Sequence, residues 1–173
     1  MKRLSLVAVA VAVLAVCGFC AGAVPVKLSL VPSVETSPSR HNLEGLGLGI
    51  LGANYQDAEG VSLSLIWTNV DGDMNGTNGA YIFTRVQGAM SGHQAALVCI
   101  NGKMSGIQTG FYTQTDDLHG YQVGIINNSQ NVKGLQLGLV NIARSLRGVQ
   151  IGLVNVAKTG GFAPVMVIIN ASF

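Results

Sequence analysis

Apolar residues alternate with glycine or polar residues over most of this chain. Between Lys133 and Gly160 one phrase occurs twice in nearly the same letters, KGLQLGLVNIARSL and then RGVQIGLVNVAKTG. Successive side chains of a β-strand point to opposite faces, so a two-residue period predicts strands with one apolar face. We therefore expect an all-β protein built from an internal repeat of 14 residues.

The repeat can be followed in both directions from this pair. Numbered from a charged or polar first residue, it starts at Glu44, Glu59, Asn75, Ser91, Ser105, His119, Lys133, Arg147 and, in a last and weaker copy, Gly161. Successive starts are 15, 16 and 16 residues apart, and then 14 apart to the last. Positions 3, 5 and 7 are mostly apolar, as in Leu135, Leu137 and Leu139, whereas position 4 is often glutamine, as in Gln136. Each repeat is expected to supply a strand of about ten residues and a short turn.

The two ends of the chain carry their own signals. Residues 1–23 combine Lys2 and Arg3 with an apolar run and small residues up to Ala23, which is typical of a secretory signal peptide cleaved after Ala23. Residues 24–173 are then a single β-repeat domain, with a first strand over 24–34 and a polar loop over 35–42. Residues 163–173 alternate again and end on Phe173, like the last strand of a bacterial outer-membrane β-barrel.

Two architectures fit a repeat of this kind. The predicted fold is an antiparallel up-and-down β-barrel of about ten strands, because the first strand, the complete repeats and the last strand give an even number. The alternative is a β-solenoid, in which each repeat forms one coil. In the barrel Leu135 lies opposite Asn155. In the solenoid equal positions stack, so that Leu135 lies beside Val149 and Asn141 beside Asn155.

Individual positions favour one architecture or the other. Position 9 holds Trp67, Phe83 and Cys99 in some repeats, which suits a lipid-facing surface better than a stacked column of asparagines. Position 14 is apolar, as in Leu118 and Val132, which favours the solenoid. Only 10% of the residues are charged, and nearly all of these lie near strand ends or turns. A charge-free central zone favours a lipid bilayer as the partner, and hence the barrel.

Charge excludes one class of partner. Two of the 10 basic residues, Lys2 and Arg3, lie in the predicted signal peptide, and the remainder balance the 8 acidic residues. A neutral chain without a basic patch is not expected to bind nucleic acid. Cleavage of the signal peptide also leaves Cys99 as the one cysteine of the exported chain. No internal disulfide is therefore expected, and Cys99 is predicted to be buried and inert.

Two groups of residues were considered for chemistry, and neither is predicted to form a site. Asp71, Asp73 and Asn75 match the first half of a calcium loop, but the twelfth position of that loop is Ile82 where a glutamate is needed. A turn is the preferred interpretation. The second group comprises histidines with nearby serines: His41, His93 and His119 with Ser91 or Ser105. Because no motif joins them, we predict no catalytic, cofactor-binding or metal-binding residues and no enzyme activity.

The segments GLQLGLVNIARSLRGVQIGLVNVAK (134–158) and PVMVIINASF (164–173) resemble the surface repeat-containing proteins of spirochaetes and other Gram-negative bacteria. The resemblance implies an exported protein of the outer membrane or cell surface. That family has no established activity, so the resemblance adds no site residue. The predicted function is a structural or surface-interaction role. The alternatives are a secreted β-solenoid binding module or adhesin and, as the weakest, an outer-membrane enzyme with a site at the barrel rim.

Overall fold

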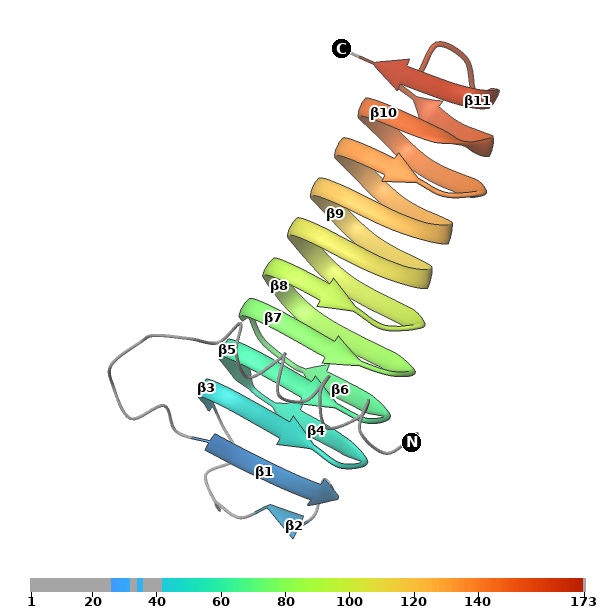
Figure 1. Ribbon diagram of the computed structural model, residues 1–173. Coiled ribbons are helices and arrows are strands. Elements are labelled where there is room, and N and C mark those ends of the chain that lie inside the picture. Colours follow the sequence, from blue (N-terminus) through green and yellow to red (C-terminus); the bar gives the residue numbers. More distant parts are fainter. Residues whose placement is uncertain (1–25, 32–33, 36–41, 173) are drawn as a thin grey trace, which may run out of the picture.

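The computed structural model shows the chain wound into a β-solenoid (Figure 1). It describes residues 26–31, 34–35 and 42–172, and in these residues there is no helix. The predicted signal peptide, most of the predicted loop and Phe173 lie outside the described residues. The strands are β1 (Val26–Val31), β2 (Val34–Glu35), β3 (Asn42–Gly49), β4 (Gly52–Tyr55), β5 (Asp57–Ser64), β6 (Trp67–Val70), β7 (Met74–Ala80), β8 (Phe83–Ala95), β9 (Val98–Leu137), β10 (Val140–Thr159) and β11 (Val165–Ser172).

Neighbouring coils pair in parallel, and the register follows the repeat. Val149 of β10 lies opposite Leu135 of β9, a separation of one repeat. Glu59 of β5 lies opposite both Glu44 of β3 and Asn75 of β7, so the longer repeats also close one coil each. The barrel prediction is therefore wrong, and the solenoid alternative is confirmed. Leu135 faces its equivalent in the next coil and not the hairpin partner that a barrel requires.

The side chains that directly precede position 1, at position 14 of the 14-residue repeats, give the physical reason for this outcome. They form an apolar column along the solenoid interior, from Leu43 to Leu146, and each is at most 4% exposed. A coil can place position 14 inside while positions 3, 5 and 7 point outward. Each backbone amide of a coil finds its partner in the coils on either side, so no closed barrel is needed to satisfy it. The full column is Leu43, Ala58, Met74, Met90, Met104, Leu118, Val132 and Leu146.

Glutamine side chains form a second interior column. The Nε2 atom of Gln136 donates to Oε1 of Gln122 at 2.7 Å, and the Nε2 atom of Gln150 donates to Oε1 of Gln136 at 2.7 Å. The same bond links Gln108 and Gln122 to the coil before each of them. All members of this column are 0% exposed, so each amide must find its partners inside the protein. The column is Gln94, Gln108, Gln122, Gln136 and Gln150.

An asparagine column runs beside the glutamines. The Nδ2 atom of Asn127 donates to Oδ1 of Asn141 at 2.7 Å, and that of Asn141 donates to Oδ1 of Asn155 at 2.8 Å. This is the asparagine stacking that the solenoid alternative predicted. It also orients the asparagine amides, because each of their carbonyl and amino groups has a partner. In the glutamine column, by contrast, Nε2 of Gln94 and Oε1 of Gln150 have no hydrogen-bond partner among the described residues.

Trp67 and Phe83 do not belong to the asparagine column, contrary to the position 9 numbering of the sequence. Trp67 lies opposite Phe83, and Phe83 lies opposite Val98, which is at position 8 of its own repeat. The longer repeats carry an extra residue before this point. Once that residue is counted, Thr84 aligns with Cys99, and all members of the asparagine column have small or polar side chains.

A glycine at position 2 lets successive coils approach closely. Gly134 has φ of 142°, a conformation that side-chain-bearing residues rarely adopt. A Cβ atom on it would lie 2.0 Å from the carbonyl oxygen of Gly120 in the preceding coil. The same contact recurs from Gly60 to Gly148, which explains why glycine recurs at this position.

The C-terminal strand caps the solenoid and does not close a barrel. β11 runs antiparallel to β10, with Ser172 opposite Gly148 and Ile169 opposite Ile151. Asn170 holds the preceding loop, since its Oδ1 accepts from the backbone of Phe162 and its Nδ2 donates to the carbonyl of Ala163. At the other end β1 pairs in parallel with β3, and β2 pairs antiparallel with β1.

Candidate binding surface

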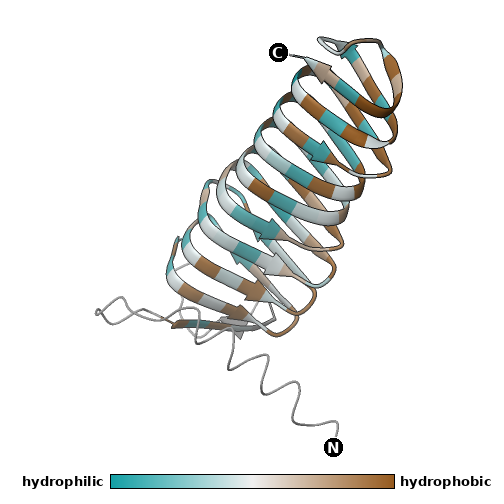
Figure 2. Cartoon of the chain, turned by 45° about the horizontal axis from the view of Figure 1, so that its top comes forward, coloured by the Kyte–Doolittle hydropathy of each residue, from teal (hydrophilic) through white to brown (hydrophobic). Residues whose placement is uncertain are grey.

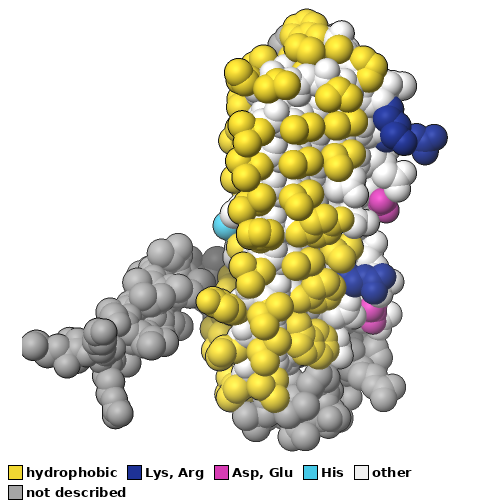
Figure 3. All heavy atoms as spheres, turned by 90° about the vertical axis from the view of Figure 1, so that its right-hand side faces the viewer, with side chains coloured by type: hydrophobic (Ala, Val, Ile, Leu, Met, Phe, Trp, Pro, Cys, Tyr) yellow, Lys and Arg dark blue, Asp and Glu magenta, His cyan; other side chains and the backbone are white. Residues whose placement is uncertain are grey.

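The outward side chains of positions 3, 5 and 7 form one continuous surface on the eight coils that start from Glu44 to Arg147, and we call this surface the apolar face. Hydrophobic and hydrophilic residues alternate along the coils (Figure 2), and hydrophobic side chains gather in columns along the length of the solenoid (Figure 3). Position 7 is the most exposed of the three columns, with exposed fractions from 37% to 75%. Its members are Ile50, Leu65, Tyr81, Leu97, Phe111, Ile125, Leu139 and Leu153.

The apolar face contains no Asp, Glu, Lys or Arg, and its one histidine is His93. Coils stack about 4.8 Å apart and a strand rises about 3.3 Å per residue, so the face covers roughly 600 Å². That area lies at the upper end for the largest apolar patch of a soluble monomer, and such patches mark interaction sites. Leu51, Ile66 and Ile82 continue the apolar surface around the next corner of the coil.

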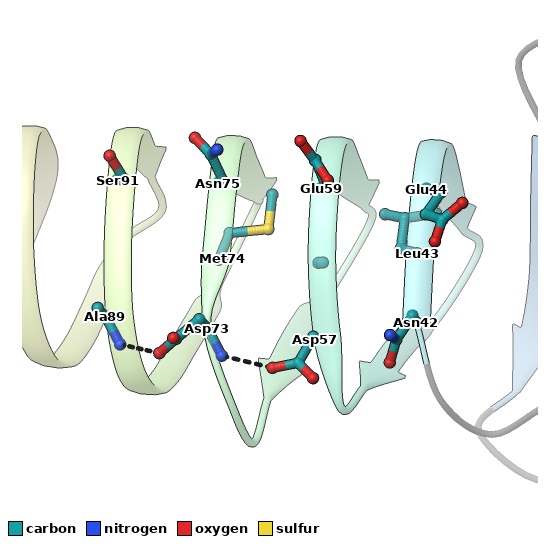
Figure 4. A pocket seen from close by; sticks show the side chains of 11 residues that line it. Asn42, Leu43, Glu44, Asp57, Glu59, Asp73, Met74, Asn75, Ala89 and Ser91 are labelled. Atoms are coloured by element: carbon teal, nitrogen blue, oxygen red, sulfur yellow. Dashed lines mark hydrogen bonds between the residues drawn. The ribbon is translucent and has the colours of Figure 1, made fainter.

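A column of position 1 residues borders the apolar face, and we call it the rim column. Glu44, Glu59, Asn75 and Ser91 lie in one row on successive coils (Figure 4). The row continues through Ser105, and Arg147 lies opposite Lys133 at its far end. The full column is Glu44, Glu59, Asn75, Ser91, Ser105, His119, Lys133 and Arg147. A groove of about 540 Å³ runs between the N-terminal part of this column and the neighbouring turns.

Charge is distributed unevenly along the solenoid axis. Residues 44–73 contain five carboxylates and no lysine or arginine: Glu44, Asp57, Glu59, Asp71 and Asp73. Residues 133–158 contain four cations and no carboxylate: Lys133, Arg144, Arg147 and Lys158. The first coils are therefore acidic and the last coils are basic, although residues 24–173 contain equal numbers of acidic and basic residues.

The carboxylates of the calcium-like segment hydrogen-bond to neighbouring coils. Oδ1 of Asp71 accepts from Nε2 of Gln87 at 2.7 Å, and Oδ1 of Asp73 accepts from the backbone amide of Ala89 at 2.7 Å. The amide of Asp73 in turn donates to Oδ1 of Asp57 at 2.9 Å (Figure 4). These bonds give the acidic residues a role in stacking the turns. Within the described ranges, no group of three or more His, Cys, Asp or Glu side chains is placed to hold a metal ion.

Of the candidate histidines, His119 shares a column with the two serines and His93 does not. His93 lies on the apolar face opposite Ile107, whereas Ser91 and Ser105 lie opposite each other in the rim column. His119 follows Ser105 in the rim column, and His41 lies outside the described residues. The structure therefore does not bring His93 into the serine column.

Cys99 lies inside the solenoid and not on the apolar face, where the sequence numbering had placed it. It is 0% exposed, and its sulfur donates to the carbonyl oxygen of Thr109 at 3.4 Å. Burial raises the pKa of the Cys99 thiol, while hydrogen bonds with the Thr84 side chain and the Ala96 backbone act in the opposite direction. A protonated, buried thiol of this kind is a poor nucleophile, as the sequence predicted.

Comparison with known proteins gives no match to a protein-family model, a curated protein or a solved structure. No helix among the described residues is long and apolar enough to cross a membrane. The acidic and basic ends of the rim column are visible in the sequence, but only the parallel stacking shows that these residues form one row beside the apolar face.

Proposed function

We propose that this protein is exported and acts at the cell surface as a non-catalytic interaction module that binds through the apolar face. The observation that supports the proposal most strongly is the exposure of the position 7 column, whose eight members are all apolar and all reach solvent. Burial of apolar area is the dominant favourable term in most protein association. A solenoid suits this role because its repeated coils present one extended surface.

The proposed location depends on the ends of the sequence and on its resemblance to surface proteins. Residues 1–23 have the charged start, apolar run and small-residue end of a secretory signal peptide. The repeats over 134–158 resemble those of bacterial surface proteins. Both features support an exported chain that begins at Val24 and is retained at the outer membrane or cell surface.

Site-specific photo-crosslinking in intact cells tests this proposal. A photoreactive phenylalanine analogue is placed at Leu139 on the apolar face, or at Gln130 of β9, which lies outside that face. Leu139 and Gln130 are both exposed, so each probe can reach a bound partner. We expect an envelope-associated chain that begins at Val24 and forms an adduct from position 139 only. Equal adduct formation at both positions, or none at position 139, would refute the apolar face as the binding surface.

A further inference from the structure

We propose that the apolar face binds the apolar face of a second copy of this chain, with the two solenoid axes antiparallel. This inference rests on the proposed function and names the partner of the same surface. Two sheets that pack face to face lie about 10 Å apart, and their outward side chains interdigitate. The arrangement uses one surface twice, as a two-fold symmetric dimer does.

The rim column determines the orientation. A two-fold axis parallel to the strands keeps equal positions opposite each other and reverses the order of the coils. Coil one of one protomer then faces coil eight of its partner. Glu44 lies across from Arg147, and Glu59 lies across from Lys133, at both ends of the interface. A two-fold axis along the solenoid would instead place the two rim columns at opposite edges of the interface, where no such pairs form.

When two rim columns run in opposite directions, the charges of one are complementary to the charges of the other along the whole column. Its order is acidic, then neutral, then basic, so reversal places every carboxylate near a cation. The middle of the column pairs Asn75 with His119 and Ser91 with Ser105, which introduces no like charges. Complementary charge of this kind selects register and partner more than it adds affinity.

The shape of the apolar face agrees with the same reversal. Five of the eight coils carry branched aliphatic or aromatic residues at both positions 3 and 5. The fourth coil carries His93 and Ala95, the fifth carries Thr109 at position 5, and the third carries Thr77 and Gly79. Antiparallel packing places that coil against the sixth, which carries the larger Tyr121 and Val123. Small side chains then lie opposite large ones, which favours close packing.

The available area is sufficient for a specific dimer. Covering both faces would bury roughly 1,200 Å² in total, the lower end of the range for stable protein–protein interfaces. A lipid surface is a poorer match to the rim column. It would present similar headgroups to the acidic and the basic end alike, whereas a reversed copy presents the opposite charge at each end.

Sedimentation equilibrium of the exported chain over a concentration series tests this proposal. We expect a monomer–dimer equilibrium that weakens as salt is added. Glu59→Lys should raise the dimer dissociation constant on the order of ten-fold, because one substitution creates two repulsive contacts by symmetry. Within one chain this change removes the like-charge contact of Glu59 with Glu44, so the fold is expected to survive. If the Glu59→Lys variant does not fold, Arg147→Glu provides the same test of the interface.

Charge exchange and a matched control complete the experiment. Adding Lys133→Glu to Glu59→Lys should restore the wild-type dissociation constant. Arg85→Glu is the control, because Arg85 is exposed and lies in another part of the coil, opposite Asn69 and Ile100, and the change should leave the dimer unchanged. A dimer that is insensitive to Glu59→Lys and Arg147→Glu would overturn the antiparallel arrangement.

Two outcomes separate this inference from the proposed function. An adduct from position 139 to a different molecule, with a chain that stays monomeric at every concentration, would overturn the dimer and leave the interaction module standing. Binding of that monomer to vesicles of phosphatidylethanolamine and phosphatidylglycerol would identify lipid as the partner and equally overturn the dimer. Absence of any adduct at position 139 would remove both proposals.

Discussion

Gln136 and Leu137 are neighbours in sequence with opposite surroundings. Gln136 is 0% exposed and takes part in two ladder bonds, to Gln122 and from Gln150. Leu137 points outward on the apolar face and is half-buried by its neighbours in adjacent coils. The alternation in the sequence already separated the inner glutamine from the outer leucine. It did not reveal the amide ladder, which depends on which strand lies beside which.

Arginine substitutions at these two positions should have very different costs. Gln136→Arg buries an unpaired charge and breaks two amide bonds, so we expect it to lower the free energy of unfolding by about 3–5 kcal/mol. Leu137→Arg keeps its charge in water and should cost about 1 kcal/mol or less. Urea titration of both variants measures the difference, with the exposed Gln130→Arg as the reference. A larger cost for Leu137→Arg is the order expected of a lipid-facing strand and would contradict the solenoid.

At the scale of a single element, the glycine at position 2 sets how closely two strands can stack. Gly134→Ala forces φ of 142° on alanine and places its Cβ against a backbone oxygen that cannot move away. We expect a loss of about 3 kcal/mol or more in the free energy of unfolding, measured by thermal or urea denaturation. Gly79→Ala is the matched control. Its Cβ would meet the flexible Leu63 side chain at 2.9 Å, whereas the nearest backbone atom, the oxygen of Ser62, would be 4.0 Å away. Similar losses for the two variants would show that the position 2 contact is unimportant.

The sequence predicted strands, faces and repeat length, but it did not decide how the strands pair. A repeat of 14 residues is even, so an outward residue such as Leu135 stays outward in a barrel and in a solenoid alike. Trp67 at position 9 wrongly favoured the barrel over the solenoid, because an extra residue in the longer repeats moves Trp67 out of the asparagine column. The apolar position 14, as in Leu118, was the signal that pointed to the correct fold. The candidate surface was visible as a pattern, whereas its rim required the stacking of Glu44 on Glu59.

At the scale of the whole molecule, each coil is an interchangeable unit. Deletion of residues 133–146 joins Val132 to Arg147, which takes the place of Lys133 and preserves every column. We expect this variant to fold with the β-sheet circular dichroism of the wild type and with slightly lower stability, since one coil–coil contact is lost. Deletion of 133–145 removes one residue fewer and turns every later side chain to the wrong face. That variant should lose cooperative unfolding of its C-terminal coils in a urea titration, and equal behaviour of the two deletions would contradict the model of stacked units.

The two amide ladders also have a consequence for the electric dipole of the molecule. Glutamine amides donate toward the N-terminal coils and asparagine amides donate toward the C-terminal coils, so their dipoles oppose each other. The interior thus adds little net polarity, and the exposed charges dominate. Carboxylates at 44–73 and cations at 133–158 lie about six coils apart, or roughly 29 Å. The solenoid therefore has a permanent electric dipole moment along its axis. Two rods that approach in dilute salt would experience a torque toward opposite alignment before any side chains touch.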